Sequence, residues 1–271
     1  MIPVLNQQTA IICITKLGAF ALLISCLEYL TQTKLLKDDG LMSWSVGRLR
    51  AALLIKGPFG TALNWISSYP NVLGLLILRS VLASVILLGP STIVMSPWIT
   101  GSIASLTLLF IIRTSYGHDG TDQMLLIVFI GLAISEIVGT VLTLNAYLWF
   151  LAFQSCFSYG TAGFAKASAK GWRDGTYLIG ICSTRIYGNT AIGSFLNSKP
   201  VLAKWLACLV IVWECSFPLV LLLPLPLALV ILGGGVLFHL INSYIMGLNT
   251  FLLTFLSTYP AILYFIQTRG W

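Results

Sequence analysis

The chain has 271 residues, of which 58% are hydrophobic and 8% are charged, and its mean hydropathy is +0.94. Soluble domains carry roughly 25% charged residues, so this composition excludes one soluble core and indicates a polytopic membrane protein. The formal charge of +7 does not indicate nucleic-acid binding, because the Lys and Arg residues form no basic stripe interleaved with aromatic residues. In a membrane protein such charges report topology and contact with lipid headgroups.

Apolar runs long enough to cross a bilayer recur along the chain, and they predict an all-α fold. We expect a polytopic integral membrane helical bundle, a single transmembrane domain over 1–271, with about eight transmembrane helices. The expected spans are 10–30, 71–88, 93–112, 123–140, 142–166, 201–222, 227–246 and 248–266, and the tract 123–166 could be divided elsewhere. No basic region precedes the first span and no small-residue cleavage site follows it, which favours a retained span over a signal peptide.

Two further segments mix charged, apolar and aromatic side chains and are predicted to be interfacial. Residues 31–70 carry five Lys and Arg among Leu, Trp and Phe, which is typical of a helix lying in the membrane interface. Residues 167–200 combine Trp and Tyr with Gly and Ser, which is typical of an interfacial or re-entrant segment. With eight spans both segments share one side with most of the basic residues, and the positive-inside rule makes that side cytoplasmic.

Ionisable residues inside the spans are candidate functional residues, because a charge in the bilayer is costly. Lys166 ends the apolar run "YGTAGFAK", where its amine either reaches the headgroups or acts as a buried general base. Glu214, in "VIVWECSF", has no charged neighbour in the sequence and needs a buried partner or a proton. Arg79 lies within a span, either in a structural ion pair or in a functional site.

A charged tetrapeptide, "WRDG", follows Lys166 at residues 172–175. It predicts an interfacial Trp172, a pair between Arg173 and Asp174, and a Gly175 able to adopt positive φ.

The two histidines both have polar neighbours. His239, Asn242 and Ser243 share one face of an expected helix, which forms either a polar contact between helices or a ligand pocket. His118 lies in the turn-rich segment "RTSYGHDGTDQ" near Asp122, either in a solvated loop or at a site.

Common enzyme signatures are not present in the sequence. It contains no GxSxG, HExxH, Walker loop or GxGxxG motif. Two distant histidines and six cysteines without metal-ligand spacing predict no metal site, and the cysteines are expected to be small core residues.

Four patches, taken in order, resemble the family of the vitamin K-dependent γ-glutamyl carboxylase and its bacterial relatives, the horizontally transferred transmembrane domain (HTTM) proteins. "FSYGTAGFAKASAKGWRDG" is similar to the family's Tyr-x-x-Ala-Gly-x-x-Lys…Trp-x-(Asp/Glu)-Gly segment. "FHLINSYIMGLNTF" resembles its Phe-His-x-x-Asn-Ser and Met-Gly-Leu-Asn-x-Phe helix. "GHDGTDQMLL" resembles a family loop with a His or Gly-Asp, and "WECSFPLVLLLP" a Glu-containing span. The matches fall between about 113 and 260, within an HTTM-like core of about 71–266.

The resemblance implies an enzyme that uses a reduced, vitamin K-like quinone and oxygen. In the carboxylase a lysine base deprotonates the reduced quinone, oxygen converts it to a strong base, and a peptide glutamate is carboxylated. The catalytic residues implied in this chain are Lys166, His239 and His118. The implied cofactor-binding candidates are Asn242, Ser243, Tyr159, Trp172, Asp174 and Glu214.

The substrate and the partners are the points at which the resemblance is least complete. The sequence has no counterpart of the extramembrane domain that holds the carboxylase's glutamate-rich substrate, so we expect a peptide or lipidic substrate. The chain is closer in size to short bacterial HTTM members, one of which is similar to a factor that matures a secreted sporulation-delaying peptide toxin with a partner protein. We therefore expect a bacterial inner-membrane location, with membrane lipids and a protein complex as partners.

The family's orientation places the site outside the cell, opposite to the side that the count of basic residues predicts. The alternative is a non-catalytic subunit or a quinone- or lipid-binding accessory protein of a larger membrane complex.

Overall fold

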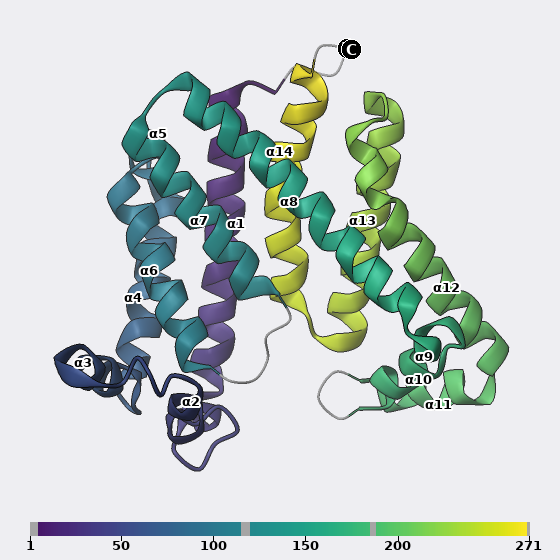
Figure 1. Cartoon of the computed structure of the whole chain (residues 1–271), viewed down its shortest axis with the longest axis horizontal. Helices are drawn as coiled ribbons and strands as arrows, with labels where there is room; N and C mark the ends of the chain where they lie inside the picture. Colours follow the sequence, from purple (N-terminus) through teal and green to yellow (C-terminus); the bar gives the residue numbers. More distant parts are fainter. Residues whose placement is uncertain (1–4, 115–119, 185–187, 270–271) are drawn as a thin grey trace. The chain divides into compact units, whose positions relative to one another are not determined.

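The structure, a computed structural model, describes residues 5–114, 120–184 and 188–269. Across these ranges the ordered elements are helices and no strand occurs, as the composition predicted (Figure 1). The α-helices are α1 Gln7–Thr31, α2 Trp44–Arg50, α3 Gly57–Ser67, α4 Val72–Leu88, α5 Ser91–Val94, α6 Pro97–Arg113, α7 Thr121–Val138, α8 Val141–Ser168, α9 Lys170–Arg173, α10 Thr176–Ser183, α11 Thr190–Ser198, α12 Pro200–Ser216, α13 Leu225–Met246 and α14 Asn249–Thr268. Two 3-10 helices, η1 Thr33–Leu36 and η2 Phe217–Leu221, complete the set.

Six helical segments in the described ranges are long and apolar enough to cross a bilayer. They are α1, α7, α8, the α12–η2 segment Pro200–Leu221, α13 and α14. The helix α4 meets the same test only together with α3, to which it is joined at an angle of 78°, and α6 is apolar but has 17 residues. The integral membrane bundle is therefore supported, and each predicted span coincides with a helix, whereas the predicted count of eight is not confirmed.

Local sequence signals explain where several helices begin and end. Asn6 caps α1 by accepting a hydrogen bond from the backbone N–H of Thr9 at 2.7 Å. The apolar tract 123–166 is broken at Gly139, whose φ of 68° ends α7 in the left-handed conformation that favours glycine. Pro200 lies in the first turn of α12, where its missing N–H costs no hydrogen bond. The predicted division between the fourth and fifth spans is thereby confirmed.

The described chain falls into two compact units. Of the described residues, the N-terminal unit comprises 6–114, 120–147 and 253–257, and the C-terminal unit comprises 5, 148–184, 188–252 and 258–269.

In the N-terminal unit α1, α4, α6 and α7 lie side by side (Figure 1). The helix α1 packs along α4 and α6 packs along α7, with further contacts between α4 and α6 and between α1 and α7. Fully buried side chains such as Leu22, Leu76, Phe110 and Phe129 fill the space between them. The predicted interfacial segment 31–70 forms η1, α2 and α3, and α2 and α3 contact one end of α6.

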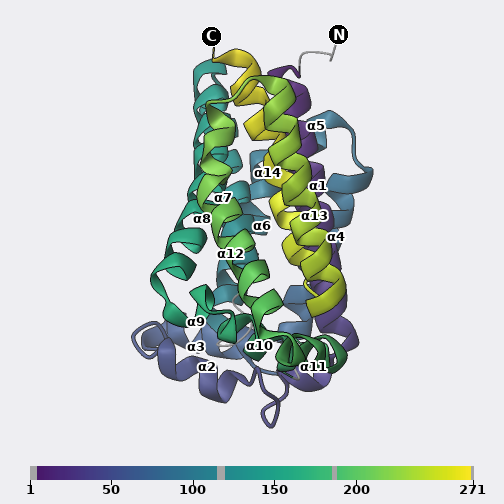
Figure 2. The same cartoon turned by 90° about the vertical axis from the view of Figure 1, so that its right-hand side faces the viewer.

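In the C-terminal unit α8 contacts α14. The short helices α9, α10 and α11 gather at the beginning of α12 (Figure 2). Phe265 of α14 makes edge-to-face contacts with Trp149 and Phe153 of α8 at centroid distances of 5.6 and 5.2 Å. Cys182 and Leu196 form a small buried cluster with Ala203 of α12. The predicted interfacial segment 167–200 is therefore a set of short helices with its own apolar core.

Candidate functional site

Lys166 and Glu214 form an ion pair between α8 and α12. The Lys166 amine donates to both carboxylate oxygens of Glu214, at 2.7 Å to Oε1 and 2.6 Å to Oε2. The Glu214 side chain is 4% exposed and the Lys166 side chain 20%. Glu214 thus has a partly buried ion-pair partner, and the Lys166 amine turns toward α12 rather than away from the fold.

Two glycines of α8 allow this pair to form. A Cβ atom on Gly163 would lie 2.7 Å from the backbone nitrogen of Cys215 and 3.0 Å from the carbonyl carbon of Glu214. A Cβ on Gly160 would lie 3.2 Å from the side chain of Pro218. Only glycine permits so close an approach at Gly163, so "YGTAGFAK" brings the lysine within reach of the carboxylate.

A second polar cluster joins α8, α13 and α14. The hydroxyl of Tyr159 is hydrogen-bonded to Nε2 of His239 and, at 3.0 Å, to the hydroxyl of Tyr259. His239 is fully buried, and Tyr159 and Tyr259 are buried as well. Gly235 makes room for this contact, because a Cβ there would lie 2.0 Å from the Tyr259 oxygen. The cluster links two sequence-predicted residues with Tyr259, which the sequence analysis missed.

Aromatic rings connect the two clusters. The ring of Tyr159 packs against Phe217 at a centroid distance of 3.8 Å and against Trp213 at 5.4 Å. Trp213 directly precedes Glu214 in α12. In α8, Tyr159 lies seven residues before Lys166, which separates the two by about 10 Å along the helix axis. The ion pair and the tyrosine–histidine cluster therefore occupy one continuous contact between α8 and the α12–η2 segment.

The "WRDG" segment adopts a turn in which the predicted pair does not form. The Arg173 guanidinium donates to the carbonyl oxygens of Ala167 and Ser168 at the end of α8, at 2.7 and 3.2 Å. Asp174 instead accepts bonds from the hydroxyl and backbone N–H of Thr176. The prediction of a pair between Arg173 and Asp174 is wrong, because each group satisfies backbone or side-chain groups within its own turn.

Asp174, Trp172 and Gly175 of this turn differ in their relation to the ion pair. The hydrogen bonds from Thr176 hold the pKa of the exposed Asp174 carboxyl below its usual value. The Trp172 ring lies 5.3 Å from the Lys166 amine, at cation–π distance, so it is beside the ion pair. Gly175 has a φ of 86°, as predicted, and a Cβ there would lie 2.5 Å from the backbone of Lys204. Asp174 is thus a local turn residue, and Trp172 is the member of this segment that contacts the site.

Asn242 and Ser243 lie toward the end of α13, one turn beyond His239. Both side chains are half-buried, and the Ser243 hydroxyl donates to Oδ1 of Asn249 at 2.7 Å, across the turn between α13 and α14. Ser243 therefore stabilises a helix junction, and the structure shows no contact that joins it to Lys166.

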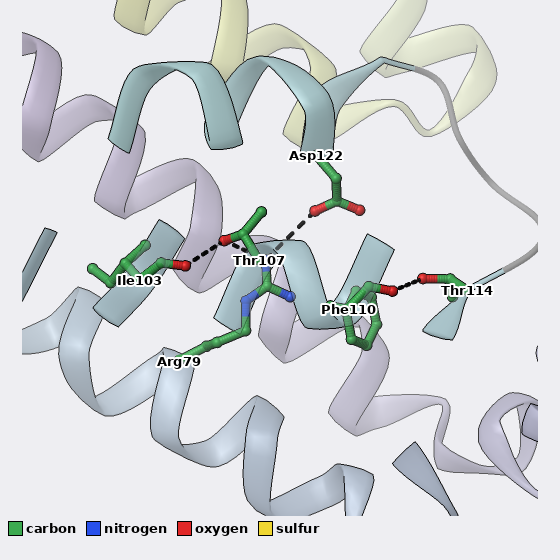
Figure 3. Close-up of polar contacts among 6 residues, drawn as sticks. All are labelled: Arg79, Ile103, Thr107, Phe110, Thr114 and Asp122. Atoms are coloured by element: carbon green, nitrogen blue, oxygen red, sulfur yellow. Dashed lines mark hydrogen bonds and ion pairs between the residues drawn. The ribbon is translucent and has the colours of Figure 1, made fainter. Parts of the chain in front are cut away.

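The N-terminal unit holds a separate buried charge pair. Arg79 of α4 is fully buried and donates from Nη2 to Asp122 at 3.5 Å and to Thr107 at 3.4 Å (Figure 3). Its guanidinium also lies over the ring of Phe110, 4.9 Å from the centroid. These contacts favour the structural interpretation of Arg79. His118, the predicted loop histidine, lies outside the described residues.

The described residues include an open groove but no candidate metal site. Among the described side chains no group of three or more His, Cys, Asp or Glu could hold a metal ion, and all six cysteines are free thiols. An open apolar groove of about 630 Å³ runs between α1 and α4 in the N-terminal unit, lined by Leu23, Leu27, Ile77, Val81 and Val85 among others. It contains none of the described site candidates, so the chemistry available to the protein is better represented by the polar clusters.

Comparisons with protein-family models, curated proteins and solved structures found no match to this chain.

Proposed function

We propose that the chain is an HTTM-like integral membrane protein that binds a quinol-like ligand and transfers a proton from it through Lys166. The observation that carries the proposal is the Lys166–Glu214 pair, in which a lysine amine of an apolar helix bonds both oxygens of a buried carboxylate. The resemblance adds a peptide or lipidic substrate, eight spans and a bacterial inner-membrane location to the proposal.

Glu214 allows Lys166 to act as a base, because it can take the proton that the lysine ammonium must lose first. While the pair is ionised, the ammonium of Lys166 can only donate. Transfer of one proton from Lys166 to Glu214 leaves a neutral amine and a neutral carboxyl, with no net change of charge in the apolar surroundings. The amine can then take a proton from a ligand hydroxyl and become an ammonium again, while the ligand oxygen becomes an anion.

The donor set suits a ligand with two ring oxygens. The amine of Lys166 and the polar cluster of Tyr159, His239 and Tyr259 offer hydrogen-bonding groups at two levels of the same helix contact. Aromatic faces of Trp213 and Phe217 lie between them, and such faces suit a flat apolar ring. A bound reduced quinone would supply an acidic hydroxyl and reactivity toward oxygen. The chain's own residues would orient its oxygens, remove the proton and exclude water.

A binding and turnover experiment tests the proposal. The purified full chain is titrated with reduced menadione, a naphthoquinol, while the quenching of tryptophan fluorescence and the uptake of oxygen are recorded. We expect saturable binding in the wild type, and a loss of oxygen uptake of about a hundredfold or more in Lys166→Gln and Glu214→Gln, as for removal of a general base. Lys170→Gln is the matched control, since Lys170 is an exposed lysine one turn further along the chain.

The result that contradicts the proposal is oxygen uptake and quinol binding in Lys166→Gln equal to the wild type. The alternative, a non-catalytic subunit, predicts a different pattern: no quinol-dependent oxygen uptake in the wild type, and co-isolation with a larger membrane complex that Lys166→Gln leaves intact.

A further inference from the structure

The residues 44–67, here called the α2–α3 platform, form a preorganised surface outside the helical bundle of the N-terminal unit. Trp44, Ala51 and Leu63 form a buried cluster, against which Leu109 and Ile112 near the end of α6 pack. The Trp44 indole N–H donates to Oδ1 of Asn64 at 2.6 Å and thereby ties α2 to α3. The platform is thus an ordered part of the fold.

Arg113 fastens this region to the end of α6. Its guanidinium is fully buried and donates to the backbone carbonyls of Leu36, Met42 and Ser67, at 2.8, 2.8 and 3.0 Å. These three carbonyls precede α2 and end α3, so one side chain fixes both ends of the platform. Bonds from a charged donor are among the stronger ones in proteins, and a buried guanidinium satisfied by three carbonyls holds its geometry.

The helix α3 exposes large apolar side chains as well as burying residues against the fold. Gly60, Leu63 and Ser67 are buried, whereas Phe59 and Trp65 are each 67% exposed. In α2 and the turn after it, Leu49 is 72% and Leu53 85% exposed. An ordered surface with this many exposed large apolar side chains indicates contact with lipid or with another protein.

The charge of the platform favours anionic lipid. Residues 41–70 contain Arg48, Arg50 and Lys56 and no Asp or Glu, and all three basic side chains are exposed. The helix α3 is bent by 78° from α4. If α4 crosses the bilayer along its normal, α3 lies almost in the membrane plane, which is the orientation of an interfacial amphipathic helix. In both views α2 and α3 lie at the same end of the N-terminal unit (Figures 1 and 2).

We propose that the α2–α3 platform is a docking surface for anionic phospholipid, in which Phe59 and Trp65 enter the acyl boundary and Arg48 and Lys56 bind the headgroup phosphates. The site is separate from the one in the C-terminal unit and does not depend on the proposed function. It also sets the level of the bilayer surface at the junction between α3 and α4.

Two measurements on the reconstituted full chain test the proposal. The first is binding of phosphatidylglycerol against a phosphatidylcholine background, measured as the lipid retained in native mass spectrometry. Because each basic residue near an anionic surface contributes about a fivefold factor, Arg48→Gln/Lys56→Gln should weaken retention by about tenfold or more. The matched control is Lys170→Gln/Lys204→Gln, which removes two exposed lysines of the C-terminal unit. An equal loss in both double variants, or no loss in the first, overturns the proposal.

The second measurement places Trp65. The difference in fluorescence between the wild type and Trp65→Phe isolates this residue among the eight tryptophans. We expect that difference to be quenched by lipids brominated near the headgroup end of the acyl chain and not by aqueous iodide. Quenching by iodide would place the face in water, and shielding from both quenchers would mean that a protein, such as a second copy of the chain, covers it. Either result overturns the assignment to lipid.

Discussion

Replacing Lys166 by methionine would show how strongly the ion pair holds α8 against α12. The substitution keeps an unbranched side chain but leaves the carboxylate of Glu214, which is 4% exposed, without its two hydrogen bonds. Removing one partner of a buried pair costs about 3–5 kcal/mol. The loss has an upper limit of about 4 kcal/mol at pH 7.5, because protonating an ordinary carboxyl at that pH costs about that much.

The same reasoning predicts a recovery when both charges are removed. In Lys166→Met/Glu214→Met the buried charge is gone and the side-chain volume is similar, so the stability should return to within about 1 kcal/mol of the wild type. Glu214→Met alone should cost less than Lys166→Met, because the remaining Lys166 is 20% exposed and its amine can reach polar surroundings.

Thermal unfolding in detergent at pH 7.5 measures these effects. A loss of about 3 kcal/mol corresponds to a Tm lower by about 5–10 °C for a chain of this size. The reasoning is refuted if Lys166→Met melts with the wild type, or if the double variant is no more stable than Lys166→Met.

Three further predictions concern helix approach, the platform and the turn after α8. Gly163→Ala should lower stability by about 1–3 kcal/mol through overpacking, whereas Gly233→Ala, whose Cβ would meet nothing within 4 Å, should raise it slightly in the same melting assay. Arg113→Met leaves three backbone carbonyls unsatisfied and should make the 31–67 segment susceptible to limited proteolysis, with the rest of the chain protected. Because its folded-state pKa is lowered, the Asp174 carboxylate should stabilise its turn fully above pH of about 4 and lose that effect below it. Thr176→Val should abolish this acid dependence of local amide exchange, and an unchanged profile would contradict the assignment.

The candidate site shows how far local sequence information reaches. Lys166 and Glu214 each stood out as lone charges in apolar helices, but nothing in the sequence paired them. The glycines of "YGTAGFAK" allow a close approach between helices, but they do not specify the partner helix. Tyr259 was missed because a tyrosine in an apolar helix is common. The available signal was its hydroxyl, which needs a partner when buried.

The sequence by itself determined the elements of this protein. The hydropathy of each run, together with Gly139 and Pro200, decided where the helices begin and end, because a helix satisfies its backbone hydrogen bonds within its own segment. Tertiary structure alone decided which charges meet: Lys166 with Glu214, and Arg79 with Asp122. These partners lie far apart in the chain, and their contact depends on how whole helices pack and in which register, which no local pattern specifies.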